Sequence, residues 1–294
     1  MIKADASAER RELRPIARAC GSRVNWSYAP IMSDERQLPS PDPAFRWSHE
    51  SWGLALRCAR LEPVAQHLFT TRQLELRDPV RLAESWAQAA EAVGATIDDL
   101  KRVKQVHGRT VHVVNREDAH STVTPEADAL VSNIPGIALA VKVADCVPVL
   151  IADPRTGAAA AVHAGWRGSA AGVPAAAVET LTREYHTRPR DLVAAVGPCI
   201  GPCCYEVGQD VVDAFAAAGA SGQQLTRWFV RTEGQLRLDL WTVTSDRLID
   251  AGLLPDRIHL CGLCTKTHAW IFDSYRAHGV AAGRMAAIIR VPRS

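Results

Sequence analysis

Three short segments each place a metal-ligating or nucleophilic side chain beside a glycine or a turn. They are Lys-Gln-Val-His-Gly (104–108), Ala-Asp-Cys-Val-Pro (144–148) and Val-His-Ala-Gly-Trp-Arg-Gly (162–168). Side chains at strand ends can converge from different strands on one pocket. The two imidazoles of His107 and His163 and the thiolate of Cys146 would then form a three-ligand metal set. Zinc sites of this kind keep their fourth position for water or substrate and are typical of catalysis. Side chains that simply fill a core are the alternative.

The segment Gly-Trp-Arg-Gly (165–168) joins an apolar run to the expected start of a helix. Its backbone N–H groups and the helix dipole would face an anion, and Arg167 would add a bidentate clamp. A tight turn with a solvated Arg167 accounts for the same residues equally well. No Gly-Lys-Ser/Thr follows and no Gly-x-Gly-x-x-Gly occurs, so neither nucleotide-binding fingerprint is present.

The remaining cysteines give weaker signals. Cys261 and Cys264 have the spacing of a redox or zinc pair, but no second pair accompanies them, and we expect them to be structural. Cys203 and Cys204 are adjacent and poorly suited to bind one ion together. The loop 197–205 has two Pro and two Gly and is expected to form a rigid pocket wall.

The surrounding pattern predicts the elements that would position these side chains. Asp78-Pro79 and Gly94 are typical helix start and stop signals. Further helices are expected over 169–185, 209–218 and 240–251, a hairpin near 227–238, and strands over 101–107, 110–114, 137–143, 147–152, 158–163, 192–197, 257–262 and 284–291. Several strands are separated by turns too short for crossover helices. This favours an α+β fold, with mixed β-sheets flanked by helices, over a doubly wound parallel sheet.

Charge and hydropathy exclude two classes of partner. The chain has 34 Lys and Arg against 32 Asp and Glu, so it lacks the strongly basic balance of a typical nucleic-acid binder. Its best apolar stretch, 136–152, is interrupted by Lys142, Asp145 and Pro148, and predicts two buried strands instead of a membrane span. We expect no nucleic-acid or membrane partner, and a monomer or weak homo-oligomer.

The first 60 residues differ from the rest in being rich in Arg and Pro. They lack the apolar core of a secretory signal, and we expect a poorly ordered N-terminal extension over 1–60, followed by a single domain over 61–294. A cytoplasmic, reducing location follows from this expectation. There the eight Cys would be thiols or metal ligands and not disulfides.

Residues from about 101 to 291 resemble the bacterial YfiH family, also called the laccase-domain, polyphenol-oxidase or DUF152 family. The resemblance rests on long motifs in the family's order: Lys-Gln-Val-His-Gly (104–108), Glu-Ala-Asp-Ala-Leu-Val (126–131), Ala-Asp-Cys-Val-Pro-Val-Leu (144–150), His-Ala-Gly-Trp-Arg-Gly (163–168), Gly-Pro-Cys-Ile-Gly-Pro-Cys-Cys-Tyr-Glu-Val (197–207), Cys-Thr (264–265), Ser-Tyr-Arg (274–276) and Gly-Arg-Met-Ala (283–286).

The resemblance implies a zinc-dependent purine nucleoside phosphorylase that also deaminates adenosine, on an α+β fold related to a toxin domain with a Cys–His dyad. It implies Zn²⁺, in preference to copper, at His107, Cys146 and His163, and a purine nucleoside and phosphate as small-molecule substrates. Carried over by position, the other site residues would be Asp145 and Arg167 in catalysis and Arg72, Gln105, Tyr205 and Arg276 in substrate binding.

Two departures from the family pattern concern one wall of the substrate pocket. Thr71-Arg72 lacks the glycine-rich loop that usually follows such a pair, and Val143 stands where a threonine is common. In the implied chemistry, Arg167 and Arg72 would hold phosphate. The zinc ion would polarise the base or orient a water, and Asp145 would carry a proton or orient an imidazole. A turn-capping Asp145 is the equal alternative.

Three other functions remain open from the residues. A cysteine hydrolase would use Cys146 as nucleophile and His163 as base. A non-catalytic, zinc-stabilised scaffold would be consistent with the missing glycine loop. A multicopper phenol oxidase is disfavoured, because its copper sites need His-x-His pairs and the sequence has none.

Overall fold

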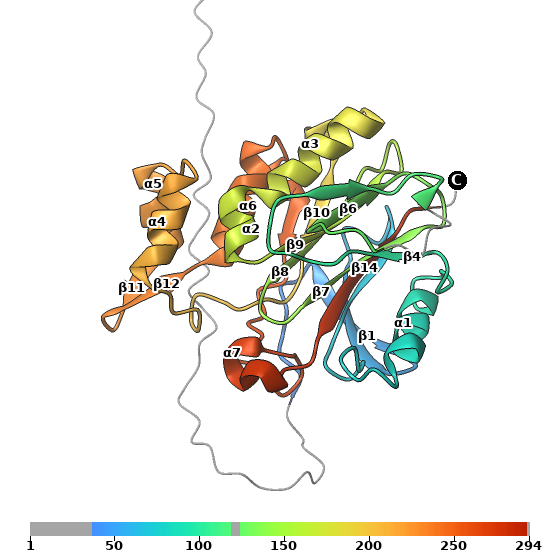
Figure 1. Ribbon diagram of the computed structural model, residues 1–294, viewed down its shortest axis with the longest axis horizontal. Coiled ribbons are helices and arrows are strands. Elements are labelled where there is room, and N and C mark those ends of the chain that lie inside the picture. Colours follow the sequence, from blue (N-terminus) through green and yellow to red (C-terminus); the bar gives the residue numbers. More distant parts are fainter. Residues whose placement is uncertain (1–36, 119–123, 293–294) are drawn as a thin grey trace, which may run out of the picture. The chain divides into compact units, whose positions relative to one another are not determined.

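The computed structural model describes residues 37–118 and 124–292, in which two six-stranded sheets lie between layers of helices (Figure 1). The first sheet has the order β1-β2-β3-β14-β7-β4. Its strands are β1 (Phe45–Glu50), β2 (Gly53–Cys58), β3 (Gln66–Thr70), β14 (Met285–Arg290), β7 (Ala138–Val143) and β4 (Leu100–Arg102). Only β4 runs parallel to its neighbour β7; the other pairs are antiparallel.

The second sheet has the order β13-β10-β8-β9-β6-β5 and carries most of the candidate site. Its strands are β13 (Ile258–Leu260), β10 (Val193–Val196), β8 (Val147–Ala152), β9 (Ala159–Ala164), β6 (Ala129–Ser132) and β5 (Val111–Val113). The outer pairs β10–β13 and β5–β6 are parallel and the inner pairs are antiparallel. Both sheets are therefore mixed, and the predicted α+β fold class is confirmed.

Seven α-helices in the described residues pack outside the sheets. They are α1 (Leu82–Glu91), α2 (Trp166–Ala171), α3 (Val173–Tyr185), α4 (Gln209–Ala217), α5 (Gly222–Trp228), α6 (Leu240–Asp250) and α7 (Tyr275–His278). A small separate hairpin consists of β11 (Phe229–Thr232) and β12 (Gln235–Leu238). α1 covers the first sheet, whereas α3 and α6 cover the second (Figure 1). None of the described helices has the length and apolar character needed to cross a membrane.

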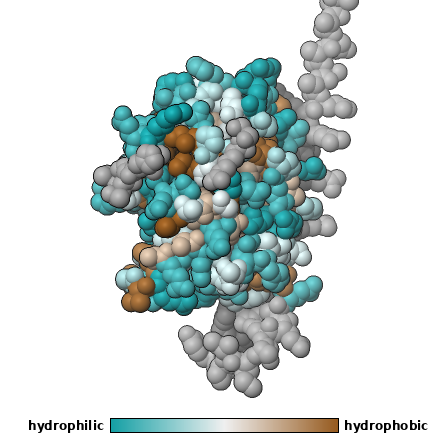
Figure 2. Space-filling model, turned by 90° about the vertical axis from the view of Figure 1, so that its right-hand side faces the viewer, coloured by the Kyte–Doolittle hydropathy of each residue, from teal (hydrophilic) through white to brown (hydrophobic). Residues whose placement is uncertain are grey.

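Alternation along the central strands explains the layering. In β8, Val147, Val149 and Ile151 face the helix-covered core, while Leu150 and Ala152 face the core between the sheets. Both faces of this strand are buried, so its sequence is a continuous apolar run without polar alternation. The face seen in Figure 2 is largely hydrophilic, with apolar side chains in small separate groups.

The structure differs from the predicted boundary at residue 60. The compact unit begins at Leu38, and β1 and β2 form an antiparallel pair at the edge of the first sheet. Phe45, Leu56 and Cys58 enter the core between the sheets. β1 is buried along only part of its length, as an edge strand should be, and its apolar periodicity is correspondingly weak. Residues 1–36, the rest of the predicted extension, lie outside the described residues.

Two predicted helices also have different bounds. α1 begins at Leu82, and the Asp78 carboxylate instead accepts a hydrogen bond from Val80 N (2.9 Å) in the preceding turn. The helix expected over 169–185 is two helices, α2 and α3, separated by Gly172, whose φ is +84°. Pro174 has no N–H to continue α2, and only glycine adopts this left-handed φ without strain.

His67 in β3 is a buried, neutral histidine that sequence analysis did not single out. Its Nε2 accepts a hydrogen bond from Cys58 N (2.8 Å), and its Nδ1 donates to the Ala65 carbonyl (3.0 Å). Burial lowers the pKa of His67 to about 4. The folded protein therefore resists protonation of a ring that is readily protonated in the unfolded chain.

This pKa predicts an acid-dependent loss of stability. Above pH 6.5 the contribution of His67 is fully present, and it is lost as the pH falls from there toward 4, by about 3 kcal/mol in total. The free energy of unfolding, measured with denaturant, should differ less between pH 7 and pH 5 in His67→Gln than in the wild type. The amide oxygen of the glutamine can still accept the hydrogen bond from Cys58. His112→Gln, on the partly exposed β5, is the control. Equal pH dependence in wild type and His67→Gln would contradict the assignment.

Candidate metal centre and surrounding pocket

His107, Cys146 and His163, which are distant in sequence, meet at one end of the second sheet. His107 lies in the loop between β4 and β5, Cys146 directly precedes β8, and His163 is in β9. Because β8 and β9 pair with Pro148 opposite His163, Cys146 lies close to that imidazole. The ligand atoms of the three side chains all lie within 4.8 Å of one another. The structure thus brings together the three residues whose convergence the sequence left open.

The arrangement fits a single metal ion. Cys146 Sγ and His107 Nε2 are 4.0 Å apart, and the two imidazole rings meet edge to face with centroids 4.8 Å apart. A tetrahedral zinc ion with bonds of about 2.0–2.3 Å would separate its ligand atoms by about 3.4–3.8 Å. A Cβ on Gly165 would lie 2.9 Å from Cys146 Sγ and 3.0 Å from a carbon of the His107 ring. The glycine therefore leaves the space that these two ligands occupy.

Asp128, which sequence analysis missed, supports two of the three side chains. It precedes β6 and is fully buried. Its Oδ1 accepts hydrogen bonds from His163 Nδ1 (2.9 Å) and His107 N (2.9 Å), and its Oδ2 accepts from Gly108 N (2.6 Å). The backbone of His107 has a φ of +61°, a left-handed conformation that the carboxylate stabilises through these N–H groups.

The Asp128 contact also fixes which nitrogen of His163 is available. With Nδ1–H donated to the carboxylate, Nε2 is the free nitrogen, as in carboxylate–histidine–metal arrangements. One feature of the sequence could have indicated Asp128: it is a charged residue inside the apolar run 127–131. A carboxylate buried in such a run requires hydrogen-bond partners. The carboxylate that contacts an imidazole here is Asp128, whereas Asp145 was only one candidate for that role in the sequence.

The electrostatics of the cluster favour a thiolate. Burial alone would raise the pKa of Cys146, but hydrogen bonds with His107 and His163 outweigh it and lower the pKa to about 6. Burial would likewise lower the pKa of His163, but hydrogen bonds with Asp128 and Cys146 raise it to about 9. A thiolate at neutral pH is the form that binds a metal ion or acts as a nucleophile.

Asp145 links three segments around the cluster. Its Oδ1 accepts from Thr265 Oγ1 and its Oδ2 from Arg276 N, both at 2.6 Å. Its own carbonyl accepts from Ile200 N (2.9 Å). The side chain is buried and its φ is +83°. These contacts tie the end of β7 to the loop after β10, the loop after β13 and the start of α7.

Tyr205 and Arg276, two of the predicted substrate-binding residues, lie beside this network. The guanidinium carbon of Arg276 is 5.0 Å from the centroid of the Tyr205 ring, and its Nη1 donates to the Glu206 carbonyl (2.8 Å). Burial, followed by the charge of the Cys146 thiolate, raises the pKa of Tyr205. Asp145 and Arg167 also contribute to that pKa, so Tyr205 shares one electrostatic environment with them. Arg167 is exposed, and its guanidinium lies over the Trp166 ring at 4.1 Å.

The other two predicted substrate-binding side chains are engaged with backbone. Gln105 Nε2 donates to the Lys142 carbonyl (2.7 Å), and Gln105 Oε1 accepts from Lys142 N (2.8 Å). This pair of hydrogen bonds fixes the segment before His107 to β7. Arg72 donates from Nη1 to the Ala269 carbonyl (2.6 Å). These contacts hold both side chains in place. The amide of Gln105 uses both its donor and its acceptor on the backbone of β7.

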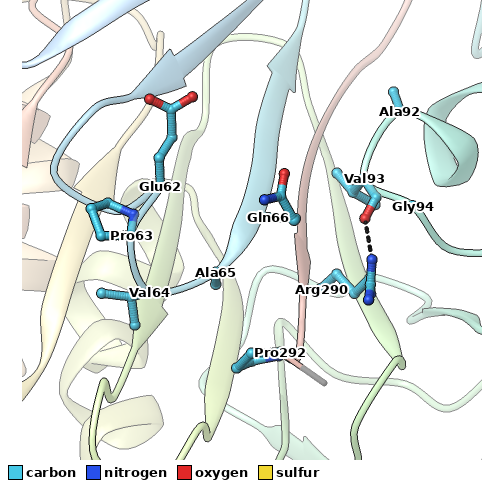
Figure 3. Close-up of a pocket in the computed structure, with 10 residues that line it drawn as sticks. All are labelled: Glu62, Pro63, Val64, Ala65, Gln66, Ala92, Val93, Gly94, Arg290 and Pro292. Carbon is cyan, nitrogen blue, oxygen red and sulfur yellow. Dashed lines mark hydrogen bonds between the residues drawn. The ribbon is translucent and has the colours of Figure 1, made fainter. Parts of the chain in front are cut away.

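A pocket of about 470 Å³ elsewhere on the molecule is lined by none of the predicted site residues (Figure 3). It lies between the turn before β3 and the end of α1. Arg290 lines it and donates from Nη1 to the Val93 carbonyl (3.1 Å). Its lining combines Glu62 and Arg290 with small apolar residues, and it holds no histidine or cysteine.

Comparison with known proteins agrees with this fold. The family model described as "Multi-copper polyphenol oxidoreductase laccase" matches residues 60–292. A purine nucleoside phosphorylase of Deinococcus radiodurans is 41% identical over 216 residues, which are 74% of this chain and 79% of that protein. Adenosine deaminase RL5, from an unknown prokaryotic organism, is 32% identical over 213 residues, 70% of this chain and 80% of that protein.

Solved structures support the same assignment. The crystal structure of the hypothetical protein YfiH of Bacillus licheniformis matches with a TM-score of 0.76 and 28% identity, over 85% of this chain and 99% of that one. The chain therefore belongs to the laccase-domain family that includes YfiH, which confirms the resemblance drawn from its motifs.

Proposed function

We infer that this protein is a zinc-dependent purine nucleoside phosphorylase that also deaminates adenosine. The observation that carries the inference is the convergence of His107, Cys146 and His163 within 4.8 Å beside a buried carboxylate. The names of the relatives, purine nucleoside phosphorylase and adenosine deaminase, supply the reaction class. The substrates would be a purine nucleoside with phosphate or water.

The three side chains would hold the metal ion, and Asp128 would keep His163 in the tautomer that binds it. Zinc at such a site supplies Lewis acidity and lowers the pKa of a bound water to about 7. We assign zinc because a catalytic zinc site is commonly built from three nitrogen and sulfur ligands. The sequence has no His-x-His pairs, which a multicopper oxidase would need.

The remaining residues would bind and orient the substrates. Arg167 and Arg276 present guanidinium groups suited to bidentate contacts with phosphate oxygens. Arg276 is positioned from two sides, because its N–H donates to Asp145 and its side chain lies over Tyr205. Asp145 accepts hydrogen bonds through both oxygens and would act mainly by positioning Arg276 and Thr265. Arg72 would contact substrate from the loop that follows β3.

Metal analysis and product analysis test the proposal together. Purified protein should contain zinc and convert adenosine to adenine and ribose 1-phosphate only when phosphate is present, and to inosine without it. Removal of the metal with a chelator should abolish both reactions, and Zn²⁺ should restore them. Metal-loaded protein that cleaves none of a panel of purine nucleosides would contradict the assignment and favour a scaffold role.

The lowered pKa of Cys146 favours one competing function, a cysteine hydrolase with Cys146 as nucleophile and His163 as base. Two treatments separate the possibilities. Metal removal would leave such a hydrolase active, whereas alkylation of Cys146 would inactivate it. Loss of activity on chelation, with recovery on adding Zn²⁺, excludes this alternative.

A further inference from the structure

A second group of metal-binding side chains lies outside the His107–Cys146–His163 set. Cys203 and Cys204 are in the loop that follows β10, and Cys264 is in the loop that follows β13. β10 and β13 are parallel neighbours, so both loops leave the sheet at the same edge. An isolated backbone β-bridge between Cys199 and Cys264 continues the strand pairing there. The three sulfur atoms all lie within 4.8 Å of one another.

The sulfurs in this cluster lie close to one another and to the hydroxyl of Thr267. Cys203 Sγ and Cys204 Sγ are 3.4 Å apart, and each is 3.4 Å from Thr267 Oγ1. Cys264 Sγ accepts a hydrogen bond from Gly201 N (3.2 Å). Cys58 and Cys261, by contrast, are fully buried in the apolar core between the sheets. Cys203 and Cys204 are partly exposed, so an ion can reach the cluster from solvent.

We propose that Cys203, Cys204 and Cys264 form a second metal site, which takes a thiophilic cation with a filled d shell such as Cu(I) or Zn²⁺. Three thiolates are the donor set that such ions prefer over harder cations. Bonds of about 2.3 Å place sulfurs about 3.8 Å apart around a tetrahedral ion. The sulfurs already lie within 4.8 Å of one another, so side-chain shifts of about 1 Å or less would close the site. Cys264 comes from a separate loop and supplies the third sulfur that the adjacent Cys203 and Cys204 need to bind an ion. The spacing of the cysteines in the sequence did not indicate this third ligand.

The proposed ion would join two loops that border the first site. Tyr205 directly follows Cys204, and Thr265, which donates to Asp145, directly follows Cys264. Arg237 holds the same loop from the other side by donating from Nη1 to the Cys203 carbonyl (2.6 Å). An ion at the three sulfurs would therefore fix the positions of Tyr205 and Asp145. Its role is positional, because none of its ligands belongs to the first metal set.

Metal stoichiometry tests the proposal on the full chain. After reconstitution with Zn²⁺, the wild type should bind two ions per chain and the Cys203→Ser/Cys204→Ser double variant one. Cys261→Ser, which removes a thiol three positions before Cys264, is the matched control and should bind two. In the Co²⁺-loaded wild type, thiolate-to-metal charge-transfer absorption should report four thiolates, falling to one in the double variant. Cu(I) titration of the double variant should likewise lose one equivalent.

Alkylation of the wild type provides a test that does not depend on folding of a variant. Zn²⁺ or Cu(I) should slow alkylation of Cys203, Cys204 and Cys264 at least tenfold and leave Cys261 unchanged, as followed by peptide mass spectrometry. One ion per chain in the wild type would overturn the proposal. So would two ions in the double variant, or equal alkylation of the three thiols with and without metal.

Discussion

Replacing His163 with alanine is expected to abolish metal binding at the first site together with nucleoside cleavage. The imidazole is one of three ligands and is almost fully buried between Asp128 and Cys146. Its removal leaves two ligands and takes one of its hydrogen-bond donors from the buried Asp128 carboxylate. Removing a hydrogen-bond partner of a metal ligand typically lowers metal affinity 10- to 100-fold. Removing the ligand itself should lower the affinity by roughly another order of magnitude. Competition with a chromophoric chelator and adenosine turnover measure the two effects.

Loss of stability has to be separated from loss of the ligand. Removing one hydrogen-bond partner of a buried carboxylate destabilises a protein by about 1–3 kcal/mol, so His163→Ala will also unfold more easily. His107→Asn avoids this cost, because His107 is exposed and asparagine tolerates its left-handed backbone. It should lose metal and activity with little change in the melting temperature. His112→Ala, on β5, controls for loss of a histidine elsewhere. Turnover unchanged in His163→Ala would remove the metal from the mechanism.

The residues that sequence analysis found are those whose chemistry is visible in a short motif. His107, Cys146 and His163 each stand beside a glycine or a turn, and β8 and β9, next to Cys146 and around His163, are apolar runs with clear ends. The central strands β8 and β9 are buried on both faces along their whole length, and β7 and β14 along most of theirs, which makes their apolar sequences easy to recognise. The fold class follows from the short turns between such strands.

Features that depend on contacts between distant segments could not be predicted in this way. Asp128 supports His163 across paired strands, and the Gln105 amide is occupied by the backbone of β7. Nothing in the local sequence indicates which carboxylate faces which imidazole, so the sequence offered Asp145 as one candidate for that role and did not indicate Asp128. Cys264 joins Cys203 because β10 and β13 are neighbours in the sheet, although more than 50 residues separate these strands in the chain. The edge strand β1 was missed because only part of it is buried.

Asp128→Asn is expected to weaken metal binding 10- to 100-fold without removing a ligand. One carboxylate oxygen accepts from His163 and His107, and the other accepts from Gly108. An asparagine must present its NH₂ group to one of these two sets, so a donor faces a donor in either orientation. The buried charge that stabilises the Nδ1–H tautomer of His163 is also lost. Nucleoside cleavage at low metal concentration should fall with the affinity and recover in part with excess Zn²⁺.

The matched control for this variant is Asp246→Asn. Asp246 is also buried, and its carboxylate accepts from Trp228 Nε1 (2.8 Å), whose ring is part of the helix-covered core. Both variants should lower the free energy of unfolding by about 1–3 kcal/mol, because each disturbs a buried hydrogen-bonded carboxylate. Only Asp128→Asn should change the affinity for Zn²⁺. If the two variants had the same metal affinity, Asp128 would be a structural residue alone, and the orientation of His163 would have to come from the packing of β9 against β8.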